Sequence, residues 1–211
     1  VDNPDFDLGM YSSIRAGIAS LPTSVAGTLL LPVDIAAVRA TTFALIAEAG
    51  RSTATLVHPT FRGEPGHPPF LPRALFAEIL AGTGEGGLAA LVARHDDEAI
   101  RLPVVDRACL RDMDHPADHA SLAAAVPHRH VPEVEECEAI FDAFAAEPRV
   151  RRHGAAVAAL ALALADRLIA SGVPLDRDLV RAGAVLHDIA KGRAHHAEVG
   201  AVMLRDLDGV S

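Results

Sequence analysis

The spacing of apolar residues changes along the chain. In the first half, short continuous apolar runs such as residues 27–33 alternate with amphipathic stretches, whereas after Glu133 apolar residues recur every three or four positions. A continuous run is typical of a strand buried on both faces of a parallel sheet, and the wider spacing is typical of a helix. The pattern therefore predicts an α/β region with a Rossmann-like layered sheet, followed by an all-α region.

The first region is expected to contain a sheet with residues 27–33 as its central, parallel strand. Shorter apolar runs predict further strands at residues 53–57 and 100–105. A segment rich in Gly and Pro at residues 62–69 predicts a loop. The predicted helices of this region cover residues 10–18, 41–50, 72–81 and 85–95.

The second region begins after a segment rich in Ala, Pro and His. Residues 121–132 have this composition and are predicted to link two domains, at residues 1–120 and 133–211. Acidic residues open a helix predicted over residues 133–146, at the end where the helix dipole favours negative charge. Further helices, and no strand, are expected after Pro148.

Histidine residues occupy matching positions on the predicted helices of the second region. His153, His187 and His196 are each in helical phase with small or apolar residues, so we expect all three to point inward. The residues in phase are Val157, Leu160, Leu164 and Leu168 for His153, Leu179 and Gly183 for His187, and Gly200, Met203 and Leu207 for His196. Asp188 adds a carboxylate, and imidazole with carboxylate suits a divalent metal. The alternative is a set of buried histidines bonded to backbone carbonyls.

Residues 150–207 resemble the first part of an HD phosphohydrolase domain. The signature of that superfamily is a His, then a His-Asp pair, then further His and a distant Asp, all on helices. Residues 186–191, Leu-His-Asp-Ile-Ala-Lys, are its most specific piece here. The resemblance implies metal-dependent phosphoester hydrolysis. The distant Asp is expected beyond Ser211, so we expect the chain to end before this domain is complete.

The same resemblance assigns roles to residues. It implies that His153, His187 and Asp188 hold a divalent ion, while His196 serves a second metal or the substrate phosphate. Mn²⁺, Fe²⁺, Ni²⁺ and Mg²⁺ all suit these ligands. Asp188 and Lys191 are the candidate catalytic residues, because Lys191 would stabilise charge on the leaving phosphate. The alternative for Lys191 is a solvated side chain at a helix C-terminus.

Short motifs in the first half carry a second resemblance. They are Gly9-Met10-x-x-Ser13-Ile14-Arg15-Ala16-Gly17, Leu30-Leu31-Pro32-Val33-Asp34-Ile35, Gly66-His67-Pro68, Gly84-Glu85-Gly86-Gly87 and Asp112-Met113-Asp114-x-Pro116-x-Asp118. In this order they resemble the molybdenum cofactor nucleotidyltransferases, with the cytidylyltransferase branch as the nearest match. The resemblance implies binding of Mg²⁺ and CTP or GTP, and transfer of the nucleotide to the phosphate of molybdopterin.

Asp34 is the central residue of this second resemblance. It follows the predicted strand at residues 27–33, and ligands of open α/β sheets bind beyond the C-terminal ends of strands. The alternative from position alone is a helix-capping Asp. The resemblance implies that Asp34 binds Mg²⁺, that Asp112 or Asp114 supplies a second carboxylate, and that Gly66-His67-Pro68 borders the cofactor pocket.

The sequence also departs from this family. The Gly-rich loop that cradles the triphosphate is expected before Val1, Ala36 stands where Pro is usual, and His115 stands where Thr is usual. We therefore expect a fragment at both ends. Without the loop, the chain is not expected to form a cytidylylated or guanylylated pterin.

Composition and charge exclude several partners. The chain has 19 Lys and Arg against 28 Asp and Glu, a net charge of −9, with no basic cluster beyond residues 149–152, which disfavours nucleic acid. Cys109 and Cys137 have no metal spacing, which favours a reduced, cytoplasmic setting. No apolar run is expected to reach membrane-spanning length, so a membrane partner is not expected.

Two functions fit these patterns. The first is a bifunctional enzyme that combines nucleotidyl transfer to a molybdopterin-type cofactor with HD-type metal-dependent phosphoester hydrolysis. The second is a non-catalytic metal- and nucleotide-binding module that regulates or assembles molybdoenzymes. The expected partners are nucleotides and phosphorylated small molecules, including molybdopterin, and a molybdoenzyme is a candidate protein partner.

Overall fold

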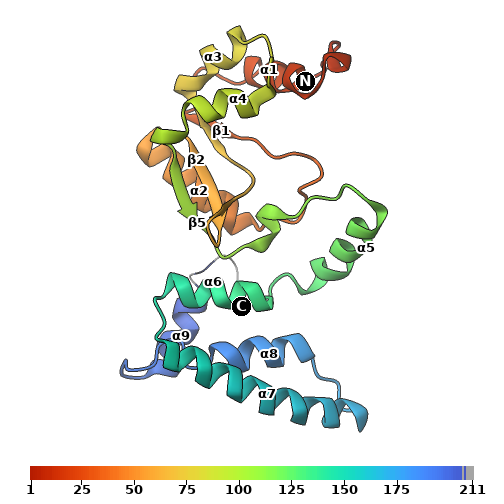
Figure 1. Ribbon diagram of the computed structural model, residues 1–211, viewed down its shortest axis with the longest axis vertical. Helices are drawn as coiled ribbons and strands as arrows, with labels where there is room; N and C mark the ends of the chain where they lie inside the picture. Colours follow the sequence, from red (N-terminus) through yellow and green to blue (C-terminus); the bar gives the residue numbers. More distant parts are fainter. Residues whose placement is uncertain (206, 208–211) are drawn as a thin grey trace. The chain divides into compact units, whose positions relative to one another are not determined.

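The computed structural model describes residues 1–205 and 207 (Figure 1). Two compact units are distinguished: Val1–Val33 with Phe43–Thr60 and Pro65–Leu102, and Asp34–Thr42 with Phe61–Glu64 and the chain from Pro103 onward. The first unit carries most of the sheet, and the chain from Pro116 onward is helical over its described elements. This arrangement confirms the predicted class, an α/β region followed by an all-α region.

The described strands form one five-stranded sheet. They are β1 (Gly27–Leu29), β2 (Val57–Phe61), β3 (Glu64–Pro65), β4 (Phe70–Pro72) and β5 (Ile100–Pro103). Their order is β1-β4-β2-β3, and β5 pairs with β2. Strand β4 is antiparallel to β1, with Thr28 opposite Leu71, and antiparallel to β2, with Val57 opposite Phe70.

The prediction that residues 27–33 form a central, parallel strand is wrong. Strand β1 has three residues, is half-buried, pairs antiparallel with β4 and stands at one end of the strand order. Leu31 and Val33, which were expected inside, are exposed. Pro32 has no N–H to donate to a ladder, so pairing stops before it. The predicted strand at residues 53–57 is also misplaced, because a helix runs to Thr53 and β2 begins at Val57.

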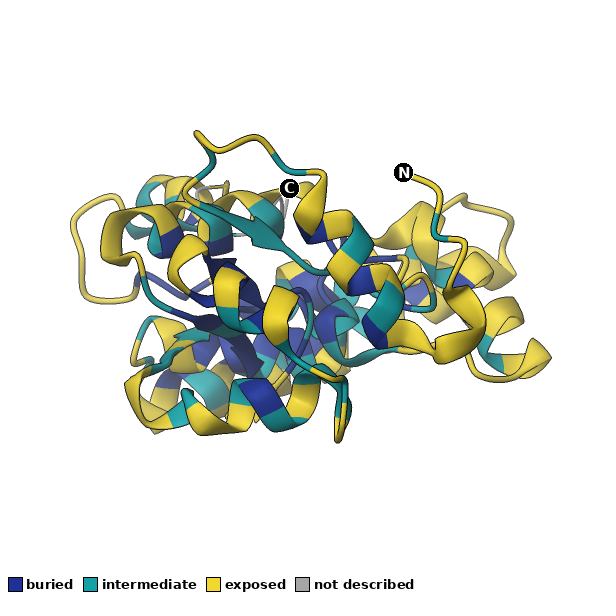
Figure 2. Ribbon diagram, turned by 90° about the horizontal axis from the view of Figure 1, so that it is seen from above, coloured by how far each residue is buried: buried dark blue, intermediate teal, exposed yellow. Residues whose placement is uncertain are grey.

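Helices before residue 100 contribute apolar side chains to cores that include strand residues, such as Ile46 with Val57 and Phe70. The helices of this region are the 3₁₀ helices η1 (Phe6–Leu8), η2 (Arg73–Leu75) and η3 (Asp96–Glu98), and the α-helices α1 (Met10–Ala19), α2 (Ala40–Thr53), α3 (Phe76–Ala81) and α4 (Gly87–Arg94). Helix α1 buries Ile14 and Ile18, which lie four positions apart on one side of the helix. Tyr11 joins them and donates a hydrogen bond to the Ile79 carbonyl at 2.9 Å. Strands β2 and β4 contain the buried segments of the sheet (Figure 2).

The second unit contains the remaining described helices. They are η4 (Arg107–Leu110), α5 (Pro116–Ala125), η5 (Val126–His128), α6 (Val134–Ala143), α7 (Pro148–Ala170), α8 (Arg177–Leu186) and α9 (His196–Arg205). Capping boxes at His115 and Glu133 fix the starts of α5 and α6. No strand occurs after Pro148 within the described residues. Residues 121–132, predicted as a linker, include the end of α5 and all of η5, and the domain limits stay a prediction.

Helix α7 buries a different face from the predicted one. The buried residues are Val150, Gly154, Ala158 and Ala165. Leu160 and Leu164, expected in the core with His153, are 74% and 59% exposed. The small side chains on the buried face allow close approach of a neighbouring backbone, because a Cβ on Gly154 would lie 2.2 Å from the Val185 carbonyl oxygen of α8.

Helix α7 also corrects the expectation about membrane-spanning length. Its 23 residues include an 18-residue window with a mean hydropathy of 1.5, which is long and apolar enough to cross a membrane by these measures alone. Only 17% of that window is buried. The uncharged stretch between Arg152 and Asp166 produces this value.

Candidate metal centres

The His187-Asp188 pair stands where α8 ends. Asp176 caps the start of this helix by accepting hydrogen bonds from two backbone N–H groups of its first turn, at 2.9 and 3.0 Å. The helix ends at Leu186, and residues 187–190 form a turn. The cap fixes where α8 begins and the turn fixes where it ends, so the two candidate ligands follow directly after the helix.

Asp188 is the centre of the cluster. Its side chain is only 6% exposed. Its oxygens contact Lys191 Nζ at 2.9 Å, His196 Nε2 at 3.2 Å, and Nε2 of both His153 and His187 at 3.6 Å. The hydrogen bond from Lys191 lowers the pKa of the Asp188 carboxyl below its ordinary value, against the opposing effect of burial. The side chain is therefore an anion at neutral pH, which is the form that binds a cation.

His187 is oriented by a backbone contact. Its Nδ1 lies 2.8 Å from the Ala184 carbonyl oxygen. A carbonyl can only accept a hydrogen bond, so Nδ1 carries the proton and donates. In the neutral ring, Nε2 then keeps a free lone pair on the side that faces Asp188. Ligating histidines are commonly held in this way.

Close packing of α7 and α9 completes the cluster. Gly154, next to His153, permits the short contact with α8 described above. Gly200 of α9 faces Ile189, whose Cγ2 would lie 3.1 Å from an added Cβ. His196 begins α9 and reaches Asp188, whereas the adjacent His195 has a side chain that is 79% exposed.

These residues form a set that can hold a metal. Ligand atoms of His153, His187 and Asp188 all lie within 4.8 Å of one another, and the two imidazole centroids are 5.2 Å apart. Two imidazoles and a carboxylate suit a borderline divalent metal. The structure thus brings together every residue that the sequence placed in this cluster, and their role as ligands stays a prediction.

Asp34 lies in a turn, not at a strand end. Strand β1 stops at Leu29, and Asp34 is followed by residues 35–39, which form neither helix nor strand. The side chain is half-buried, and its Oδ1 is buried without a hydrogen-bond partner within the described residues. A buried carboxylate oxygen without a partner is costly, and a bound cation would satisfy it. Asp34 therefore fits a metal ligand better than a helix cap.

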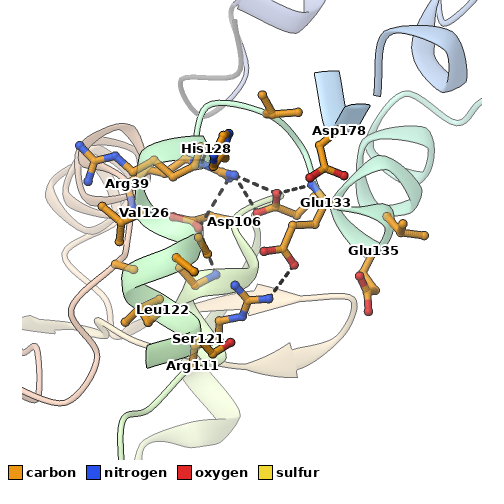
Figure 3. Close-up of a pocket in the computed structure, with 18 of the residues that line it drawn as sticks. Arg39, Asp106, Arg111, Ser121, Leu122, Val126, His128, Glu133, Glu135 and Asp178 are labelled. Carbon is orange, nitrogen blue, oxygen red and sulfur yellow. Dashed lines mark hydrogen bonds and ion pairs between the residues drawn. The ribbon is translucent and has the colours of Figure 1, made fainter. Parts of the chain in front are cut away.

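A buried charged cluster holds the segment that follows Asp34 (Figure 3). Asp106 Oδ2 accepts hydrogen bonds from the Arg39 N–H and the Thr42 hydroxyl, both at 2.7 Å, at the start of α2. The Arg39 side chain donates to both oxygens of Glu136, at 2.8 and 2.9 Å, and to the Arg129 carbonyl at 3.0 Å. Asp106 and Glu136 are 1% and 3% exposed, so each charge is buried and paired.

A cavity of about 450 Å³ adjoins this cluster. Arg39 and Asp106 line it together with Arg111, which bonds to Glu133 at 2.6 Å (Figure 3). Leu122 and Val126 supply an apolar wall. The polar side chains drawn around the cavity are largely bonded to one another, so they hold the surrounding segments together.

The remaining sites assigned by resemblance differ in burial. Asp112 and Asp114 are exposed in an irregular segment before α5. Gly66 is buried and donates its N–H to the Pro59 carbonyl at 2.8 Å, His67 is half-buried, and the peptide bond to Pro68 is cis. Within the described residues, Asp34 joins neither aspartate in a three-residue metal group. Their roles stay predictions.

The sequence patterns did not identify two structural elements of these centres. Gly154 could have been noticed, because a glycine beside His153 in an apolar helix indicates a close helix contact. The cluster of Arg39, Asp106 and Glu136 joins residues up to 97 positions apart, and no local pattern connects them.

Comparison with known proteins identifies both parts of the chain. Residues 1–99 match the family described as MobA-like NTP transferase domain, and residues 150–211 match the family described as HD domain. No curated protein matches the chain.

Three solved structures are similar in part. Rv0371c from Mycobacterium tuberculosis H37Rv is 25% identical, with 56% of this chain and 61% of that chain covered and a TM-score of 0.49. Its complex with manganese is 26% identical, with 54% and 61% covered and a TM-score of 0.47. An Rv0371c homolog from Mycobacterium sp. strain JC1 is 22% identical, with 56% and 59% covered and a TM-score of 0.47. This chain spans about three fifths of the length of each.

The two family matches confirm both resemblances on which the interpretation of the sequence rests. They cover the HD motif and four of the five quoted transferase motifs, whereas the motif at residues 112–118 lies in the unmatched stretch 100–149. The chain therefore contains a MobA-like NTP transferase domain, matched over residues 1–99, and an HD domain, matched over residues 150–211.

Proposed function

We propose that a protein containing this chain transfers a nucleotide to a molybdopterin-type cofactor and hydrolyses a phosphoester in its HD domain. At the family level, the two domains support nucleotidyl transfer and metal-dependent hydrolysis. The observation that carries the hydrolytic part is the convergence of His153, His187 and Asp188 within 4.8 Å. A cytoplasmic location and a molybdoenzyme partner belong to the same proposal.

In the HD domain, each residue has a definable task. His153, His187 and Asp188 would hold a divalent metal, with Mn²⁺, Fe²⁺, Ni²⁺ and Mg²⁺ as candidates. The metal supplies Lewis acidity toward a phosphate and lowers the pKa of water. Lys191, 2.9 Å from Asp188, places a positive charge at the centre that can stabilise the leaving phosphate. His196 lies on the other Asp188 oxygen, where it can bind a second metal or the phosphate.

In the transferase domain, Asp34 is the candidate Mg²⁺ ligand. Its buried, unpartnered Oδ1 supports this role. The proposed nucleotide is CTP or GTP, with Asp112 or Asp114 as the second carboxylate and Gly66-His67-Pro68 beside the pterin. The second candidate function, a binding module without turnover, is favoured by the exposure of Asp112 and Asp114.

Hydrolysis is tested with the 211-residue protein and bis(p-nitrophenyl) phosphate in the presence of Mn²⁺. We expect metal-dependent release of p-nitrophenol that Asp188→Asn lowers by about 100-fold or more, because it loses a ligand and the anion that pairs with Lys191. His195→Ala is the matched control and should keep the wild-type rate. Stoichiometric bound metal without any hydrolysis would favour the binding module.

The transferase half is tested by nucleotide binding. Equilibrium dialysis with Mg²⁺ and either CTP or GTP should show retention of one nucleotide, and Asp34→Asn should weaken it by about tenfold. Asp7→Asn, an exposed change in η1, is the control. Equal retention by wild type and Asp34→Asn would remove Asp34 from the site, and retention of neither nucleotide would contradict the proposed transfer.

A further inference from the structure

A polar cleft opens next to Lys191. Its volume is about 280 Å³, and it lies wholly within the second unit. Its lining includes three cationic side chains, Arg149, Lys191 and Arg193, and one anionic side chain, Glu147. The lining therefore carries an excess of two positive charges in a protein whose net charge is −9. Such a local reversal of sign favours an anionic ligand.

The N-terminus of α7 forms one wall of this cleft. Glu147, Arg149 and Val150 all belong to the first turn of this 23-residue helix or its cap. The Glu147 side chain makes no capping hydrogen bond, and the helix begins with Pro148. The positive end of the helix dipole is therefore directed to the same cleft as the arginines, and this arrangement is suited to a phosphate.

The two arginines are available for a ligand. Within the described residues, the side chains of Arg149 and Arg193 make no hydrogen bond or ion pair. Several other arginines of the second unit are paired, such as Arg151 with Asp142 at 2.7 Å and Arg177 with Asp166 at 2.8 Å, whereas Arg152 and Arg167 have no such partner among the described residues. A guanidinium binds phosphate oxygens through two parallel N–H groups, which gives both affinity and orientation.

Lys191 connects the cleft to the candidate metal centre. Its side chain lines the cleft, and its Nζ lies 2.9 Å from Asp188 Oδ2. Ile189 and Ala190, which follow Asp188 directly, also line the cleft. A ligand in the cleft is thus separated from the metal-binding carboxylate by one lysine side chain.

We propose that this cleft binds a second phosphoryl group of the HD substrate, through Arg149, Arg193 and the N-terminus of α7. The substrate class is then a phosphoester that carries at least two phosphoryl groups, one at the metal centre and the other in the cleft. The role of the cleft as a substrate site rests on the proposed hydrolytic function. Anion binding in the cleft can be measured whether or not the protein hydrolyses a phosphoester.

The probe is inorganic pyrophosphate, titrated into the metal-free 211-residue protein by isothermal calorimetry at low ionic strength. Arg149→Ala and Arg193→Ala should each weaken binding by about tenfold, because each removes a charge-assisted contact. Arg152→Ala is the matched control, since Arg152 is an exposed arginine three positions along the same helix that does not line the cleft. Circular dichroism should show all three variants folded.

The outcomes separate the cleft from the catalytic proposal. Equal losses in Arg149→Ala, Arg193→Ala and Arg152→Ala would show diffuse charge attraction and overturn the cleft as a site, as would the absence of binding by the wild type. His187→Ala should still bind pyrophosphate with the wild-type affinity. If the wild type binds pyrophosphate but holds no metal and hydrolyses nothing, the hydrolytic proposal fails and the anion site stands. If hydrolysis occurs but neither arginine affects binding, the cleft proposal fails alone.

Discussion

The two candidate metal centres are built in different ways. In the HD domain, His153, His187, Asp188 and His196 stand at or near helix ends, and three helices converge on one carboxylate. In the transferase domain, Asp34 lies in an irregular segment held by the charged pairs of Arg39 with Asp106 and Glu136. The first centre could be predicted from the sequence because its ligands lie in or next to regular helices. The segment of the second centre is held by buried charged residues that lie far apart in the sequence.

This difference predicts different modes of failure. The HD centre should lose metal through a single ligand substitution while the fold persists, since most of its side chains are partly exposed. The segment that carries Asp34 should instead respond to changes in residues that never touch a ligand, because loss of one partner leaves a buried charge unpaired.

The largest expected effect is on metal binding. His187→Ala should lower bound metal in the HD centre by about 100-fold or more, because it removes a ligand held by the Ala184 carbonyl. The measurement is metal content by mass spectrometry on protein purified without a His tag. His195→Ala should keep wild-type metal. Equal metal content in His187→Ala and the wild type would mean that the histidines of the cluster are structural and do not bind the metal.

The second effect is on stability. Asp106→Ala should lower the free energy of unfolding by about 3 kcal/mol, since it removes the acceptor of the Arg39 N–H and the Thr42 hydroxyl. Urea denaturation followed by circular dichroism measures it. Asp112→Ala, an exposed change, should stay within about 0.5 kcal/mol of the wild type. Similar values for both would mean that the buried cluster does not hold its segment.

A smaller effect is expected where α7 meets α8. Gly154→Ala should destabilise the protein by about 1–3 kcal/mol, because the new Cβ would lie 2.2 Å from the Val185 carbonyl oxygen. Gly183→Ala, a helical glycine with no atom within 4 Å of an added Cβ, should stabilise by up to about 1 kcal/mol. Thermal unfolding of both variants checks the opposite signs. A stabilising Gly154→Ala would show that the two helices do not pack closely.

The smallest effect is expected for a substitution on the solvent-exposed face of α7. Leu160→Ala should change the free energy of unfolding by less than about 0.5 kcal/mol, because Leu160 is 74% exposed. Leu186→Ala, at 3% exposure, should cost about 2–5 kcal/mol. Both are measured by urea denaturation. A large loss of stability in Leu160→Ala would mean that the leucine face of α7 is buried, as helical phase predicted, and would contradict the observed packing.

Much of the helical region followed from local sequence signals. The start of α6 was predicted within one residue, because the acidic segment from Glu133 includes its capping box. The cluster around Asp188 was predicted from the resemblance to HD domains, whereas helical phase alone was misleading, because Leu160 and Leu164, which are in phase with His153, are exposed. The buried face of α7 was not predicted correctly, since Leu160 and Leu164 have the right period but the small residues meet α8.

The sequence by itself determined which residues have helical period and where several helices begin. These properties depend on neighbours a few positions away, so a local pattern records them. Only the tertiary structure decided that β1 pairs antiparallel with β4, that Gly154 is the contact point with α8, and that Arg39 is bonded to Glu136. These depend on segments far apart in the chain, where the energy of pairing and burial is set by the partner and not by the local pattern.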